Sequence, residues 1–449
     1  MHLTQPLIRR GIECARRADV ARRPQQGYRS PIAPWKPLYW DANRLFYVIH
    51  GINRSAPMSS QRVRHPPTAL PTDVARLRRI ANRARCLGPL MLLGLALGAC
   101  QPREPVKIGF VAGLSGRAAD LGISERNGVQ LAVDDANAAG GIDGRTIVLI
   151  VHDDEQKTEL TARAVAELAD GGVEFVVGPM TSSTAVAGAA VANQRKLVMI
   201  SPAGTTHELS GKADFFFRCI ADAPAAARQQ ADFLYERGQR NLAVLGDQNN
   251  RAFVESYSAA LSARFNERGG KVVISLSFQS GAETRFAELA QQLLAARPDV
   301  VMVIAGAVDT ALVAQNIRKL DTQVLMTTTP WAGTEELIQL GGRAMEGAFV
   351  PQYFDRNSRA VAFVAFAERY RKRFGEEPGF PATLGHDAVT LGLAGVRQRT
   401  QGQTLRDSLA SRAEYPGLQQ PTRIDRNGDG TNGLFMTTIT NGRYESVLP

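Results

Sequence analysis

From Val106 onward, short apolar segments rich in β-branched residues alternate with longer segments of helical period. The segments expected to form strands are Val106 to Ala112, Thr146 to His152, Glu174 to Gly178, Leu197 to Ser201, Asn241 to Gly246, Val272 to Phe278, Val300 to Ala305 and Gln323 to Thr327. Their near-continuous apolar content is typical of parallel strands covered on both faces. Strands that alternate with helices predict βαβ units with right-handed crossovers. The sequence therefore predicts an α/β protein with two doubly wound parallel sheets.

Helices are expected between these strands and near the C-terminus. Their ranges are Glu125 to Ala138, Ala223 to Arg237, Phe253 to Arg268, Thr284 to Ala296 and Ser358 to Phe374. Ser124 is the candidate N-cap of the first helix, and Gly140-Gly141 ends it. Asn441-Gly442 lies between two apolar segments and predicts a β-hairpin of Leu434 to Ile439 with Tyr444 to Val447.

The formal net charge of +10 is unevenly distributed along the 449 residues. Basic residues are concentrated in residues 1–100, and residues 101–449 carry a small net negative charge. Nucleic-acid binding needs a basic patch on the folded domain, because the phosphates must be neutralised. A nucleic-acid partner is therefore not predicted.

Residues 74–100 have the organisation of an export signal. Five arginines between Arg76 and Arg85 precede an apolar segment, Leu87 to Leu97, that is too short for a membrane-spanning helix. The sequence Leu97-Gly98-Ala99-Cys100 resembles a bacterial lipobox, which implies lipidation at Cys100 and a membrane-anchored protein in the periplasm or at the cell surface. A buried core helix is the alternative.

The first 73 residues are rich in arginine and proline and show no clear periodicity. Two interpretations stay open: a disordered extension, or a start site assigned too early, with true initiation at Met58 or Val74.

The sequence contains no metal or redox motif of interpretable spacing. None of the four cysteines pairs with another at such a spacing, and Cys219 is expected to be a buried small apolar residue. Asp425 to Gly430 begins like a calcium loop, but Met436 occupies the twelfth position, where a bidentate glutamate is needed. A simple turn is therefore favoured, and neither a metal nor a cofactor is predicted.

Several motifs follow one another in order over the first hundred residues of the predicted folded part. They are Ile108-Gly109, Gly113-Leu114-Ser115-Gly116, Gly128 to Val133, Asn137 to Arg145, Asp153-Asp154, Phe175 to Pro179 and Ile200 to Thr205. Their order and spacing resemble the leucine/isoleucine/valine-binding family of periplasmic ABC-transporter substrate-binding proteins, in its lipoprotein form. The resemblance extends over essentially all of the chain from Val106.

This resemblance implies two lobes joined by three crossings of the chain, with a small ligand bound in the cleft and closure on binding. One lobe is expected to comprise residues 106–221 and 350–424, and the other residues 222–349 and 425–449. It also implies a membrane permease as partner.

Two loops are candidates for holding a ligand carboxylate. Met180 to Thr184 follows one strand and opens a helix, where free backbone N–H groups collect, and Ala203 to Thr205 follows the next strand. Both loops lie at carboxyl ends of parallel strands, where open α/β sheets bind ligands. Ser182, Ala203 and Thr205 are therefore the candidates, as the family positions also imply. The alternative is helix capping by Ser182 and a turn at Thr205.

The second lobe departs from the family pattern. Arg251 stands where a tyrosine is expected, the usual aromatic is missing near Ala307 and Val308, and threonines replace the acidic residue before Trp331. The remaining candidates are Ser115, Arg251, Asp309 and Trp331. Arg251 could contact a second ligand carboxylate or a salt-bridge partner across the hinge. Asp309 could bind an ammonium group or interact only with its helix dipole.

Catalytic motifs are missing from the sequence. There is no nucleophile elbow, no phosphate-binding glycine loop and no cluster of histidines at interpretable spacing. A binding protein rather than an enzyme is predicted. A regulatory or ligand-sensing lipoprotein of the same fold, such as a cell-wall synthase activator, is the second hypothesis, because fold alone does not fix function.

Overall fold

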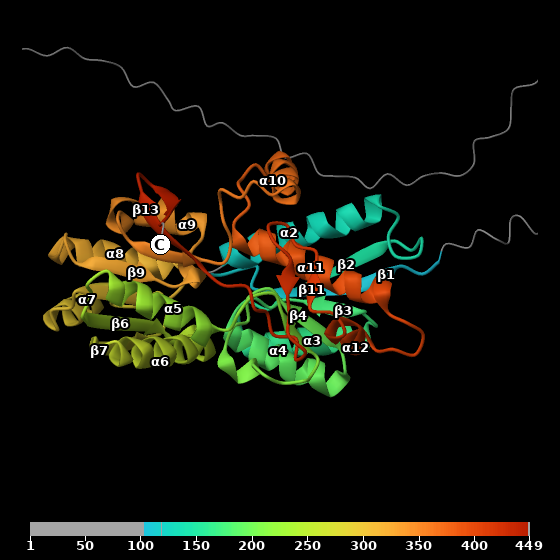
Figure 1. Ribbon diagram of the computed structural model, residues 1–449, viewed down its shortest axis with the longest axis horizontal. Coiled ribbons are helices and arrows are strands. Elements are labelled where there is room, and N and C mark those ends of the chain that lie inside the picture. Colours follow the sequence, from blue (N-terminus) through green and yellow to red (C-terminus); the bar gives the residue numbers. More distant parts are fainter. Residues whose placement is uncertain (1–102, 118, 448–449) are drawn as a thin grey trace, which may run out of the picture. The chain divides into compact units, whose positions relative to one another are not determined.

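The computed structural model describes residues 103–117 and 119–447 (Figure 1). The expectations for residues 1–73, for the export signal and for Cys100 lie outside these described residues.

The first lobe is built on a parallel sheet. Within the described residues this sheet has five strands in the order β2-β1-β3-β4-β5. The strands are β1 (Val106–Ala112), β2 (Ile147–Asp153), β3 (Phe175–Val177), β4 (Val198–Ser201) and β5 (Phe216–Arg218). The helical segments between them are α2 (Ala119–Ala138), α3 (Thr158–Asp170), α4 (Ser182–Arg195) and the short η1 (His207–Leu209).

The second lobe is built on a mixed sheet, which in the described chain has seven strands in the order β14-β13-β10-β9-β8-β6-β7. The strands are β6 (Asn241–Asp247), β7 (Lys271–Phe278), β8 (Val300–Ile304), β9 (Leu325–Thr328), β10 (Phe349–Gln352), β13 (Phe435–Thr440) and β14 (Arg443–Ser446). Its helical segments are α5 (Ala223–Glu236), η2 (Gln248–Asn250), α6 (Arg251–Glu267), α7 (Phe286–Ala295), α8 (Ala307–Leu320), η3 (Pro330–Ala332), α9 (Glu335–Gly341) and η4 (Gly342–Met345).

Three segments of the described chain run between the lobes, at residues 219–222, 353–360 and 424–434. Between the second and third, the chain returns to the first lobe, where α11 packs against α2. This part holds α10 (Val361–Phe374), α11 (Phe380–Gln398), α12 (Leu405–Ala410), β11 (Glu414–Tyr415) and β12 (Thr422–Arg423). The α/β class and the two-lobe arrangement expected from the sequence are confirmed.

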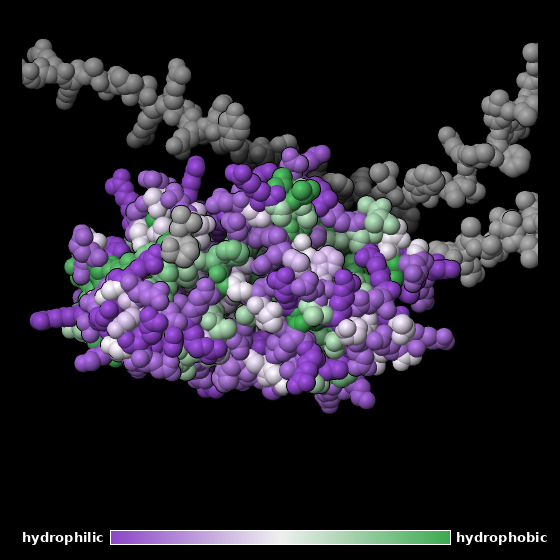
Figure 2. Space-filling model, viewed as in Figure 1, coloured by the Kyte–Doolittle hydropathy of each residue, from purple (hydrophilic) through white to green (hydrophobic). Residues whose placement is uncertain are grey.

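Burial explains why these segments form strands. The side chains of β3 and β8 are buried along their whole length, because helices cover both faces of each sheet. Cys219 is also buried, as predicted. Hydrophilic residues cover most of the face shown in Figure 2. In the described part of the chain, no helix has the length and apolarity needed to cross a membrane.

The predicted hairpin is confirmed. β13 and β14 pair antiparallel, and Asn441 and Gly442 both adopt positive φ, at 51° and 68°. Two-residue hairpins with this backbone favour asparagine and glycine.

The N-cap prediction for Ser124 is wrong, because α2 begins five residues earlier. Its first turn contains Gly122, which lowers helix propensity but allows close packing. A Cβ atom at this position would lie 2.1 Å from the carbonyl oxygen of Gly113. Tertiary contact therefore outweighs local propensity here.

Besides the two-residue strands β11 and β12, two strands were not predicted, and both carry a residue unusual for a strand. β5 ends on Arg218, and β10 contains Pro351. β10 belongs to the second sheet, which therefore extends three residues beyond the expected boundary at 349/350. Gly428 and Asn432, expected in the second lobe, accept hydrogen bonds from the backbone N–H groups of Arg218, at the end of β5, and Ala221, in the crossing after it.

Candidate ligand-binding site

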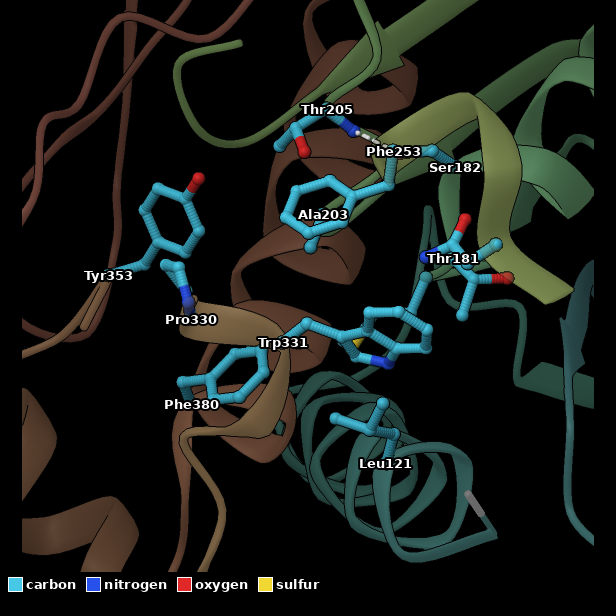
Figure 3. Close-up of a pocket in the computed structure, with 12 residues that line it drawn as sticks. Leu121, Thr181, Ser182, Ala203, Thr205, Phe253, Pro330, Trp331, Tyr353 and Phe380 are labelled. Carbon is cyan, nitrogen blue, oxygen red and sulfur yellow. Dashed lines mark hydrogen bonds between the residues drawn. The ribbon is translucent and has the colours of Figure 1, made fainter. Parts of the chain in front are cut away.

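Residues from both lobes line an apolar pocket (Figure 3). Its lining residues are Leu121, Met180, Thr181, Ser182, Ala203, Thr205, Asn250, Phe253, Pro330, Trp331, Tyr353 and Phe380. Because the loops after β3, β4 and β9 contribute to it, the pocket lies at the carboxyl ends of parallel strands. Four of the predicted site residues, Ser182, Ala203, Thr205 and Trp331, are brought together here.

Ser182 is the first residue of α4 and is buried. Its hydroxyl oxygen accepts a hydrogen bond from the backbone N–H group of Thr205 at 3.2 Å (Figure 3). It accepts a second from the N–H group of Thr206, also at 3.2 Å. A hydroxyl has two lone pairs and one hydrogen, so both lone pairs are occupied and the O–H group is left to donate. The N-cap of α4 is Thr181, so Ser182 does not cap its helix. Its side chain joins the start of α4 to the loop after β4 and presents a donor.

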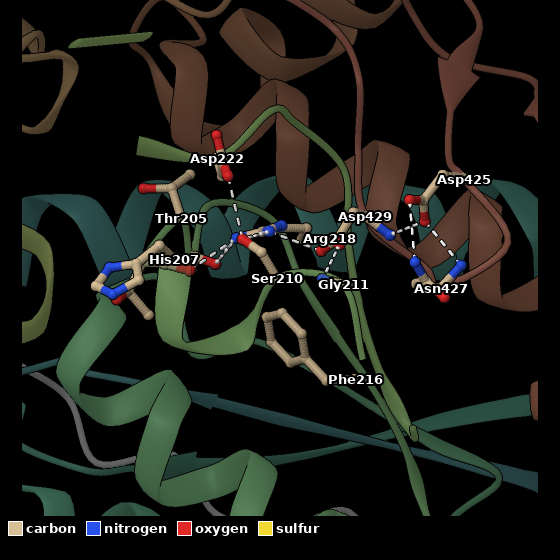
Figure 4. Close-up of polar contacts among 12 residues, drawn as sticks. Thr205, His207, Ser210, Gly211, Phe216, Arg218, Asp222, Asp425, Asn427 and Asp429 are labelled. Atoms are coloured by element: carbon tan, nitrogen blue, oxygen red, sulfur yellow. Dashed lines mark hydrogen bonds and ion pairs between the residues drawn. The ribbon is translucent and has the colours of Figure 1, made fainter. Parts of the chain in front are cut away.

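Arg218 supports the loop after β4 from behind. Its guanidinium, whose side chain is only 1% exposed, donates to the carbonyl oxygens of Gly204 at 3.3 Å and Thr206 at 3.1 Å (Figure 4). The same group donates to Ser210 Oγ at 2.6 Å and pairs with Asp429 Oδ1 at 2.6 Å. A buried cation thus fixes the loop whose N–H groups face Ser182.

Asp429 belongs to the segment that begins like a calcium loop. Asp425 Oδ1 accepts the backbone N–H groups of Asn427 and Asp429, so the segment forms a turn (Figure 4). Asp429 uses its other oxygen to accept the N–H of Gly211 at 2.6 Å. The turn therefore places the Asp429 carboxylate beside Arg218 as its counter-ion.

Tyr353 and Trp331 supply two further donors. In the described residues, neither the hydroxyl of Tyr353 nor Nε1 of Trp331 makes a hydrogen bond within 3.5 Å, although both atoms are buried and the Tyr353 hydroxyl interacts with the side chain of Thr205. Burial raises the pKa of the Tyr353 phenol well above its usual value, so the hydroxyl stays protonated at neutral pH. Buried polar groups normally have partners, and both of these line the pocket. They are suited to a ligand that accepts hydrogen bonds.

Trp331 also lines a second, more polar pocket, together with Ser115, Arg117, Asp247 and Asp309. Arg117 follows β1, and its Nη2 lies 2.5 Å from Oδ1 of Asp309, in the first turn of α8. The Asp309 side chain is 6% exposed, and this ion pair joins the two lobes.

A family model described as periplasmic binding protein matches residues 105–443. The chain belongs to this family. It is 28% identical to the Leu/Ile/Val-binding protein BraC3 of Rhizobium johnstonii over 44% of this chain and 53% of the relative. It is 22% identical to the leucine-, isoleucine-, valine-, threonine- and alanine-binding protein of Pseudomonas aeruginosa over 74% of this chain and 89% of the relative.

The solved structures give the same fold. This periplasmic binding protein is similar to the branched-chain amino acid transporter substrate-binding protein LivJ of Streptococcus pneumoniae, solved with isoleucine. The TM-score is 0.70 at 24% identity, over 77% of this chain and all of LivJ. The resemblance inferred from the sequence motifs is therefore confirmed.

The structure does not bring Arg251 to either pocket of the binding protein. Arg251 begins α6, its side chain is 70% exposed, and it pairs with Glu255 of the same helix at 3.5 Å. The salt bridge across the hinge considered for Arg251 is thus made by Arg117 instead. Asp309 is at the cleft, as expected, but its partner is a protein side chain. Ser115 lies in the polar pocket.

One expected ligand donor of the binding protein is already occupied. The backbone N–H of Ser183, in the first turn of α4, donates to Oδ1 of Asn250 in the second lobe at 3.1 Å. In return, Ser183 Oγ accepts the N–H of Ala252 at 3.2 Å. These reciprocal bonds join the lobes beside the pocket.

Sequence reasoning missed several pocket residues of the binding protein, among them Phe253, Tyr353 and Phe380. Phe253 stacks edge-on against Trp331, with ring centroids 6.0 Å apart. Arg218 was also missed, although a signal was available: it is the one charged residue in the apolar segment Phe215 to Ile220. A charge in such a segment indicates a buried, paired group.

Proposed function

We propose that the chain is the extracytoplasmic solute-binding component of an ABC transporter, and that it captures an amino acid or a related small carboxylate between its two lobes. The observation that carries this proposal is the hydroxyl of Ser182, which is fixed as a donor in a pocket lined by both lobes. The names of the relatives, which bind branched-chain amino acids, support the same class of ligand. A binding role is proposed rather than catalysis.

The partner of such a component is a membrane permease, which would recognise the ligand-bound form. The ligand stabilises the closed, ligand-bound form only to the extent that the closed form binds the ligand more tightly than the open form does. We also propose that residues 74–100 act as a signal peptide and that Cys100 carries lipid, which would anchor the protein to the membrane in the periplasm or at the cell surface.

A thermal-shift screen tests the binding role. The purified protein, unfolded and refolded to remove carried-over ligand, is screened against amino acids, short peptides, amides and small carboxylates. A ligand at 100 times its dissociation constant stabilises the folded state by about 2.7 kcal/mol, so a rise in Tm with at least one compound is expected. If no compound raised Tm, a regulatory lipoprotein of this fold would replace the transport proposal.

Replacing Ser182 by alanine is expected to weaken binding of a carboxylate ligand by about 1 to 3 kcal/mol, because a hydrogen bond to a charged group is lost. Thr205→Ala is expected to have an effect of the same order. Titration calorimetry measures both, with Ser275→Ala on the exposed side of β7 as the control. Equal affinities in all three variants would refute the site.

A further inference from the structure

The apolar pocket contains hydrogen-bond donors and an apolar wall, but no charged side chain lines it. The donors are the hydroxyl groups of Ser182 and Tyr353 and Nε1 of Trp331. The buried Arg218 guanidinium lies behind the loop that carries Thr205. A ligand carboxylate would therefore meet donors and a nearby positive charge.

A ligand ammonium group would find no anion in this pocket. Two of its neutral side-chain oxygens are also engaged: Asn250 Oδ1 accepts the N–H of Ser183, and the hydroxyl groups of Thr181 and Thr184 bond to each other at 2.6 Å. Burying a charge without an opposite charge or several acceptors is strongly unfavourable.

Two of the three acidic groups that line the neighbouring polar pocket are paired with cations. Asp309 pairs with Arg117, and Glu155 pairs with Lys157 at 2.6 Å. Asp247 accepts the backbone N–H groups of Asn249 and Ser280, both at Oδ1, and its burial raises its pKa and so disfavours its charged form. The ion pair with Arg117 thus occupies the carboxylate that an amino acid's ammonium would otherwise reach.

We propose that the ligand is an apolar or aromatic monocarboxylate without an α-ammonium group. This inference rests on the proposed function and narrows its class of ligand. Phe253, Trp331 and Phe380 would contact the apolar body, while the carboxylate would lie at Ser182 and Tyr353.

Matched pairs of compounds test this inference by titration calorimetry on the purified, refolded protein. The pairs are leucine with 4-methylpentanoate and phenylalanine with 3-phenylpropanoate, whose members differ only in the ammonium group. In at least one pair, the deaminated compound is expected to bind at least about 10-fold more tightly. Binding of leucine or phenylalanine that is as tight as, or tighter than, that of the tighter-binding deaminated compound would overturn the inference.

Failure of the inference can be told apart from failure of the proposed function. If none of the four compounds binds but the thermal-shift screen finds a ligand that carries an ammonium group or lacks a carboxylate, only the inference is overturned. If neither experiment finds a ligand, both are overturned.

Arg117→Met tests the role of the ion pair, because it frees Asp309 to accept an ammonium. The preference for the deaminated compound is expected to fall at least about fivefold in this variant. Arg163→Met is the control, since the Arg163 side chain is 69% exposed and, among the described residues, pairs with Glu167 alone on the surface of α3. An unchanged preference in Arg117→Met would overturn the role assigned to the ion pair.

Discussion

Replacing Asp429 by asparagine is expected to lower the free energy of unfolding by about 3 to 5 kcal/mol, because it leaves the guanidinium of Arg218 buried without its counter-ion. The two groups are 2.6 Å apart, and their side chains are 1% and 16% exposed. Denaturant unfolding at constant pH measures the loss. The same variant is expected to bind ligand more weakly, since Arg218 also holds the carbonyl groups of Gly204 and Thr206.

Asp425→Asn is the matched control for this prediction. Asp425 lies in the same turn but is exposed and accepts only neighbouring N–H groups. Its replacement is expected to cost less than about 1 kcal/mol. The double variant Arg218→Met with Asp429→Asn should regain stability relative to Asp429→Asn alone, since it removes the buried charge. A single Asp429→Asn variant as stable as the wild type would contradict the account.

Replacing Glu125 by glutamine is expected to stabilise the protein at neutral and alkaline pH. Glu125 lies in α2 with its side chain fully buried, and within the described residues neither carboxylate oxygen has a hydrogen-bond partner. Burial raises its pKa well above the usual value, and the charge of Asp154 adds to the effect. The folded protein therefore holds this proton at pH values where the unfolded chain has lost it.

The sign of the pH dependence follows from this difference. Below the unfolded pKa of about 4.3 both states are protonated, and the contribution of Glu125 to stability is fully present. As the pH rises toward the folded pKa, that contribution falls by about 1.4 kcal/mol per pH unit. The stability difference between Glu125→Gln and wild type should therefore widen from pH 5 to pH 8. Urea unfolding measures it, with Glu368→Gln on the exposed face of α10 as the control. A difference that does not change with pH would contradict the prediction.

The sequence predicts the strands well where local pattern decides their structure. The segment Val106 to Ala112 matches β1 residue for residue, because its apolar side chains are buried against helices on both faces. β5 was not predictable from local pattern, because it is only three residues long and ends on Arg218. The buried charge of Arg218 is compensated by Asp429, 211 positions later in the chain.

Part of the candidate site was also predictable. Ser182, Ala203, Thr205 and Trp331 each follow a parallel strand, and topology alone brings such loops to one edge. The partners of Asp309 and Arg251 were not predictable. Arg117 lies 192 residues from Asp309, and only the approach of the two lobes brings them into contact. Arg251 occupies an expected ligand position, but its side chain is exposed at the start of a helix.

Trp331 offers the most direct test of the central claim, that a small carboxylate binds between the start of α4 and this side chain. Trp331 is the only tryptophan after residue 100 in the sequence. In a double variant with Trp35→Phe and Trp40→Phe, tryptophan fluorescence therefore comes from the pocket alone. Its fluorescence is measured as 4-methylpentanoate is added to the refolded protein, and then repeated with Ser182→Ala. The account predicts a saturable change whose dissociation constant rises about 10-fold in Ser182→Ala. No change in emission, or the same curve in both proteins, would contradict it.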